Sequence, residues 1–137
     1  MKKAAWLLLV VWLVTGCNIK RRDDPAPAAP DIAGTYQMSL LASGGQTFTL
    51  PRTSGGITES GSIVVVKNSD TQIGATINTF ENGRSTSSQS LNLPIQLNGT
   101  RYDITRNGAN IGYVDGTNFN LDFIANDGTR AAIIGRK

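Results

Sequence analysis

From residue 31 to the end of the chain, apolar and polar residues alternate with a period of two. Successive side chains of a β-strand point to opposite faces, so this pattern predicts antiparallel strands with one buried and one solvated face. The alternation is clearest over residues 36–40, 73–77, 91–97 and 119–123. No window shows the 3.6-residue spacing of an amphipathic helix. We therefore expect an all-β domain.

Short turn sequences separate the alternating segments. Asn-Gly or Asp-Gly occurs at residues 82–83, 98–99, 107–108, 115–116 and 127–128, and these pairs supply the positive φ angles that tight hairpins require. The spacing predicts a meander of roughly eight or nine strands. Such a meander hides its edges most simply by closing into a small up-and-down barrel, and a β-sandwich is the alternative. Pro94 lacks an N–H group and is predicted to lie at a bulge or an opening.

The first 16 residues have the pattern of an export signal. Two lysines precede an uninterrupted apolar segment from Ala4 to Val14. At ~1.5 Å per residue this segment is about 16 Å long as a helix, which is too short for a bilayer core of ~30 Å. A basic start, a short apolar segment and small residues at its end are typical of a secretory signal.

The end of this signal, Val14-Thr15-Gly16-Cys17, resembles the lipobox of bacterial lipoproteins. The resemblance implies cleavage before Cys17, a diacylglycerol on its thiol and acylation of the new amine. Asn18, in place of the aspartate that retains such proteins in the inner membrane, implies the outer membrane. Residues 17–30 would then be the lipidated cysteine and a Pro/Ala-rich tether, which extends at ~3.1 Å per residue and carries the domain of residues 31–137.

Composition excludes much chemistry. The chain has no histidine and one cysteine, Cys17, so Ser-His and Cys-His nucleophiles and disulfides are absent from the domain. From Asp31 onward eight basic residues balance eight acidic ones, which leaves no basic patch for nucleic acid. Residues 115–118 and 126–128 offer oxygen ligands but match no calcium loop, and hairpin turns explain them. We expect no enzyme activity, no cofactor and no metal.

The domain opens with Ile32-Ala33-Gly34-Thr35-Tyr36, which resembles the Leu-x-Gly-x-Trp opening of lipocalin and calycin barrels. The resemblance implies a lipocalin-like barrel with a binding role. It also implies that Tyr36 packs at a closed end under an arginine from the last strand, for which Arg130 and Arg136 are the candidates.

The inward side chains either fill the barrel or line a cavity for one small apolar ligand. Because most of them are large, a solid core is the favoured interpretation. Leu40 belongs to the expected inward set. If a cavity exists, the candidate ligand contacts are Tyr36, Met38, Leu93, Tyr102, Tyr113, Phe119 and Phe123.

The segment from Pro51 to Gly61 is the longest without periodicity. It predicts a mobile loop that could cover a barrel mouth, or act as the contact loop of a protein-interaction or inhibitor module. With either role of this loop, the resemblance to bacterial lipoproteins implies a non-catalytic, membrane-anchored protein of the bacterial envelope. Its expected partner is a small apolar ligand or an envelope protein.

Overall fold

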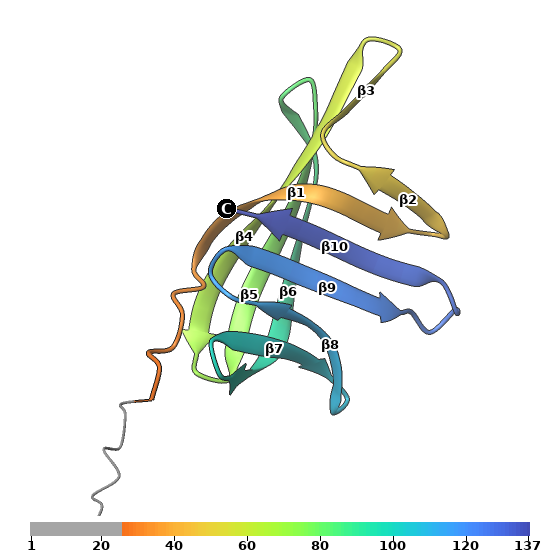
Figure 1. Cartoon of the computed structure of the whole chain (residues 1–137). Coiled ribbons are helices and arrows are strands. Elements are labelled where there is room, and N and C mark those ends of the chain that lie inside the picture. Colours follow the sequence, from red (N-terminus) through yellow and green to blue (C-terminus); the bar gives the residue numbers. More distant parts are fainter. Residues whose placement is uncertain (1–25) are drawn as a thin grey trace, which may run out of the picture.

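The computed structural model describes residues 26–137, and the proposed signal, Cys17 and the charged part of the tether lie outside that range. The described chain forms ten strands and no helix, which confirms the all-β prediction (Figure 1). The strands are β1 (Gly34–Ser43), β2 (Gln46–Thr49), β3 (Arg52–Ser54), β4 (Ile57–Ser69), β5 (Gln72–Glu81), β6 (Arg84–Asn98), β7 (Arg101–Arg106), β8 (Ala109–Val114), β9 (Asn118–Ile124) and β10 (Arg130–Arg136).

Eight of these strands close into a barrel. β4 to β10 pair consecutively and antiparallel, and β10 pairs with β1. The start of β1 also pairs with β4, with Gly34 opposite Val65 and Gln37 opposite Ser62. This β1–β4 contact joins the two ends of the sheet, so the domain is a barrel and not a sandwich. β2 and β3 are extra strands, added to the second half of β1 and the first part of β4.

The predicted Asn-Gly sequences form the hairpin turns. Asn82 and Asn107 have φ angles of 47° and 51°, and Gly83 and Gly108 follow them with φ angles of 77° and 78°. Two consecutive positive φ angles give the turn a twist that matches the strands on either side. The sequence thus determines where β5 turns into β6 and where β7 turns into β8.

One end of the barrel is closed and filled. The ring of Tyr36 has no exposed surface, its hydroxyl donates a hydrogen bond of 2.7 Å to the carbonyl of Ile32, and its centroid lies 6.1 Å from that of Phe119. The segment before β1 crosses this end against the β8–β9 turn, where a Cβ on Gly116 would lie only 2.6 Å from the carbonyl oxygen of Asp31. The N-terminal segment therefore meets the barrel at the closed end, where Ile32 is buried (Figure 1).

The cation over the Tyr36 ring is Lys137, not one of the expected arginines. Its ammonium lies 5.1 Å from the ring centroid and donates a hydrogen bond of 2.6 Å to the carbonyl of Ala33. The parity of β10 explains the correction. Gly135 is buried against Tyr36, so Arg136 faces outward and donates to Asn118, whereas Arg130 lies at the other end of β10 and pairs with Asp122.

Two irregularities in strand register reverse the expected orientation of side chains. Between Met38 and Leu40 the pairing of β1 with β10 shifts by one residue, so Leu41, opposite Ile133, packs against the core in place of Leu40. A second shift follows Ile104. Since a strand's side chains alternate strictly, one extra residue moves every later side chain to the other face.

Tyr113 is the residue most affected by the second shift. Its neighbour Gly112 lies opposite the buried residues Ile104 and Leu121, so Gly112 faces the interior and Tyr113 faces outward. The guanidinium of Arg101 lies 4.9 Å from its ring centroid. The expectation that Tyr113 points into the barrel is therefore wrong.

The segment 51–61 is a β-hairpin, not a loop. β3 pairs with the start of β4, and side chains join the two strands on both faces of the hairpin. An Arg52–Glu59 ion pair lies on one face and a 3.0 Å hydrogen bond between Thr53 and Thr58 on the other. The hairpin projects beyond the barrel at the top of Figure 1. Its alternation was hidden because both faces of an exposed hairpin are polar, which removes the signal on which a strand is recognised.

Candidate functional site

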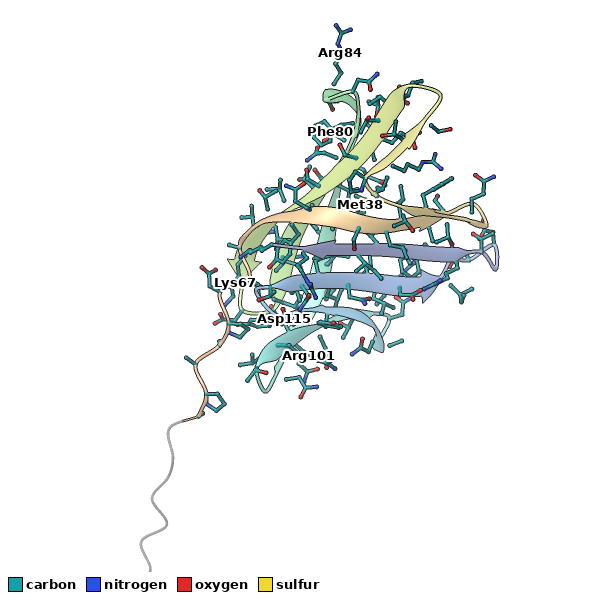
Figure 2. All side chains as sticks on the ribbon, turned by 45° about the horizontal axis from the view of Figure 1, so that its top comes forward. Met38, Lys67, Phe80, Arg84, Arg101 and Asp115 are labelled. Carbon is teal, nitrogen blue, oxygen red and sulfur yellow. The ribbon has the colours of Figure 1, made fainter. Side chains whose placement is uncertain are left out.

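The half of the barrel opposite the closed end contains a cavity of about 400 Å³. Its apolar lining comes from five strands and comprises Leu41, Ala42, Ile77, Leu91, Leu121, Phe123, Ala131 and Ile133. Polar side chains complete the lining, namely Ser43, Thr79, Ser87 and Gln89. The side chains that surround this end are shown in Figure 2. The cavity is thus an apolar space with a polar edge.

A gradient of side-chain size along the strands produces this cavity. Along β6 the inward residues change from Leu93 and Leu91 to Gln89 and Ser87, moving away from the closed end. Along β10 they change from Ile133 to Ala131. The polar inward residues are solvated and the alanine is small, so they cannot fill the interior as the leucines do. The barrel is therefore solid at one end and hollow at the other.

A second cavity of about 390 Å³ adjoins the first and shares Leu91, Leu121 and Phe123 with it. It lies between β6 and the tip of the β7–β8 hairpin, and Leu93 and Ile111 add to its apolar lining. Arg106 stands at its edge with its guanidinium 5.2 Å from the centroid of the Phe123 ring. Neither lining contains an acidic side chain, and Arg106 is the one charged residue in the two linings.

A shallower groove of about 270 Å³ adjoins the open end of the barrel, between the β2–β3 segment and the stems of β4 to β6, and shares Leu41 and Thr79 with the barrel cavity. Arg52 covers the Phe48 ring at 4.2 Å and is paired with Glu59. The hydrogen bond from Arg52 holds the pKa of the Glu59 carboxyl below its ordinary value. Arg52 and Glu59 neutralise each other, but Glu81 also lines this groove and leaves it with a net negative charge. The groove is therefore a weaker candidate site for an apolar ligand than the barrel cavity.

The predicted ligand contacts fall into three groups. Leu93 and Phe123 line the cavities, as expected for contacts. Four more form part of the filled closed end, where each is at most 3 % exposed, and these are Tyr36, Met38, Tyr102 and Phe119. Tyr113 lies outside the barrel. Sequence reasoning missed Leu41, Leu91 and Ile133 as lining residues, although the decreasing size of inward residues along β6 was a readable signal.

Asp115, at the closed end, and Asp127, at the opposite end, accept hydrogen bonds within the turns that contain them. Asp115 accepts hydrogen bonds from the amides of Thr117 and Asn118, at 2.9 and 2.7 Å. Burial acts to raise the pKa of Asp115, but hydrogen bonds from Asn118 and Thr117 outweigh it and hold the pKa below the ordinary value. Asp127 likewise accepts from the amide of Thr129. Within residues 26–137 no group of three or more carboxylate, thiol or imidazole side chains could hold a metal.

The fold and the cavity define a class, a small antiparallel β-barrel consistent with a calycin-like domain, filled at one end and hollow at the other. Comparison with models of protein families, with curated proteins and with solved structures gives no match. In the described part of the chain, no helix has the length and apolar character needed to cross a membrane.

Proposed function

We propose that the chain is a lipid-anchored protein of the bacterial envelope that binds one small apolar ligand in the open half of its barrel. The cavity of about 400 Å³ carries this proposal, because its volume lies in the range of small-molecule sites and most of its lining is apolar. The role is binding rather than catalysis. The cavity linings contain neither a histidine, a thiol nor a carboxylate that could act as a base or nucleophile.

The position of the N-terminal segment supports the anchored orientation. Residues 26–33 reach the barrel at its closed end (Figure 1), and the proposed lipid on Cys17 precedes them in the chain. A tether attached there holds the closed end toward the membrane and turns the cavity away from it. A ligand would then reach the cavity from the aqueous side, without competition from the anchor lipids.

Native mass spectrometry tests the ligand proposal. The probe is the chain from residue 17 with Cys17→Ser, purified without detergent and measured before and after denaturing extraction. We expect a retained small molecule that is lost on unfolding. Ala131→Trp, which fills the cavity, should remove that molecule, whereas Thr49→Trp on the outer face of β2 should not. Equal retention by both variants would place the molecule elsewhere and contradict the proposal.

The projecting β3–β4 hairpin supports a second candidate function, contact with an envelope protein. Ile57 lies at the tip of this hairpin and is 44 % exposed, and the cross-strand contacts of Arg52 and Thr53 hold the tip in position. A preorganised projection with an apolar tip loses little entropy on binding. A photocrosslinking residue at position 57 should then capture a discrete partner in cells that the same residue at position 47 does not. Identical capture patterns would count against this function.

A further inference from the structure

The longest strand of the barrel, β6, has one edge that is only partly paired. β5 pairs with β6 along its length, from Arg84 to Pro94, but β7 pairs only with the segment from Ile95 to Asn98. For the described residues, no strand pairs with the other edge of β6 between residues 84 and 94. The unpaired side of residues 84–94 is the open edge of β6.

The direction of the backbone groups can be derived along the open edge. The amide of Ile95 donates to the carbonyl of Thr71, at 2.9 Å, and therefore points toward β5. Because amide directions alternate along a strand, the amides of Asn92, Ser90 and Ser88 point away from β5. Pro94 has the same parity and lacks an N–H group, so it ends the pairing of β6 with β7. This agrees with the sequence-based prediction that Pro94 lies at an opening.

A second unpaired edge lies on the other side of the opening. β8 pairs with β9 only from Phe119 to Leu121. In the part of the chain that the structure describes, β9 therefore has no partner on this side from Asp122 to Ile124. Near the closed end β7 and β8 separate β6 from β9 by three strand spacings, about 14 Å at ~4.8 Å each. The tip of the β7–β8 hairpin bends away from β9 (Figure 1). A separation of about three spacings leaves room for a strand added to β6.

The side chains around this opening define what an added strand would carry. Leu91 and Leu93 of β6 and Phe123 of β9 line the cavity behind it. The outward residues Ser88, Ser90 and Asn92 are polar and exposed. A strand paired with β6 directs alternate side chains into the cavity and the others into water. The matching chemistry is an extended segment with apolar residues at every second position.

The open edge also lacks the features that usually prevent such pairing. Residues 85–93 include no charged residue and no proline, whereas exposed edges are commonly blocked by charge, proline or short length. The outer strands β2 and β3 of the same sheet are short, with four and three residues, and β3 carries Arg52. The long edge of β6 is the unprotected one.

From these observations we infer that the open edge of β6 binds an extended peptide segment of a partner protein by strand addition, with alternate apolar side chains of that segment in the barrel opening. This interaction goes beyond the small-ligand function and does not depend on it. Strand addition gains affinity from main-chain hydrogen bonds and specificity from the pockets for alternate side chains.

The test uses the chain from residue 17 with Cys17→Ser and a labelled peptide, acetyl-Thr-Val-Thr-Val-Thr-Val-Thr-amide. With valines in the opening, the threonine amides face β6 and the valine amides face β9. We expect saturable binding that N-methylation of two threonine amides weakens at least about tenfold, whereas N-methylation of two valine amides changes it little. In hydrogen exchange, the amides of Ser88, Ser90 and Asn92 should gain protection when the peptide binds.

Matched variants of the protein give an independent readout. Ser90→Pro removes one amide donor from the open edge and should weaken peptide binding about as much as methylation, whereas Ser90→Ala keeps the amide and should not. Ser90→Pro should still retain the small molecule expected in the cavity, which separates a failure of this inference from a failure of the proposed function.

Three results would overturn the inference. The first is absence of peptide binding. The second is equal binding of the two methylated peptides, which would mean that valine side chains enter the cavity without strand pairing. The third is protection of the open-edge amides that rises with protein concentration in the absence of peptide, which would show a second copy of the chain on this edge.

Discussion

At the scale of single residues, Tyr36 is the best-defined group of the closed end. Burial, followed by the nearby carboxylates of Asp115 and Asp31, raises the pKa of its phenol from 10.0 to about 12. The folded state therefore holds the proton more tightly than the unfolded state does. The resulting contribution to stability is fully present below about pH 10 and is lost as the pH rises toward about 12.

Tyr36→Phe should flatten this pH dependence. The free energy of unfolding of the variant should fall less steeply between about pH 10 and 12 than that of the unchanged protein. At neutral pH the variant should be less stable by about 1 kcal/mol, because the hydrogen bond to Ile32 is lost. Urea unfolding at neutral pH and between about pH 10 and 12 measures both effects, and equal pH slopes would contradict the assignment.

Gly112 tests the close approach of β8 and β9. A Cβ at this position would lie 2.0 Å from the carbonyl oxygen of Asn120, which belongs to the backbone and cannot move aside cheaply. Gly112→Ala should lower the free energy of unfolding by about 3 kcal/mol or prevent folding. Gly74→Ala is the matched control, because its Cβ would meet only side-chain atoms, of Asn68 at 3.4 Å and of Asn92 at 4.0 Å. This variant should be neutral or slightly stabilising. Thermal unfolding that affects both variants equally would argue against this packing.

At the scale of elements, the sequence predicted the positions of the strands better than it predicted which side chains of each strand face inward. The alternation and the Asn-Gly turns indicated the barrel strands and the meander, because both signals are local. The shifts after Met38 and Ile104 are not local: each depends on how the strand fits a neighbour distant in sequence. They explain why Leu40 and Tyr113 were assigned to the wrong face, and why the lining residue Leu41 was missed.

The register shift in β1 makes a direct prediction. Leu41 faces the cavity opposite Ile133, whereas Leu40 lies on the outer face. Leu41→Ala should destabilise the domain by roughly 1–2 kcal/mol, below the 2–5 kcal/mol of a fully buried leucine, because one side of Leu41 faces a cavity. Leu40→Ala should cost less. If chemical denaturation gives the opposite order, the shift is placed incorrectly.

At the scale of the whole molecule, the candidate site was only partly predictable. The sequence offered a solid core and a ligand cavity as alternatives, and the structure contains both, in opposite halves of the barrel. Tyr36 and Phe119 belong to the filled half, whereas Phe123 lines the hollow half. Periodicity indicates which residues face inward but not how far the barrel narrows, so it could not separate the two groups.

The proposed lipid anchor at Cys17 is tested in cells. Cys17→Ser should release a folded domain from the membrane fraction, because the thiol that would receive the lipid is absent. Fractionation followed by immunoblotting measures this, and the Tyr36→Phe variant, which keeps Cys17, is the control. A Cys17→Ser protein that stays in the membrane fraction would refute lipid anchoring.

The central claim is that the open half of the barrel is an apolar binding cavity. It is tested most directly by fluorescence titration with N-phenyl-1-naphthylamine, a neutral apolar probe, on the unchanged domain, Ala131→Trp and Thr49→Trp. We predict saturable binding at one site per chain for the unchanged domain and Thr49→Trp, and its loss in a folded Ala131→Trp variant, whose indole fills the cavity. Saturable binding of the same strength to all three proteins, or to none of them, would contradict the account.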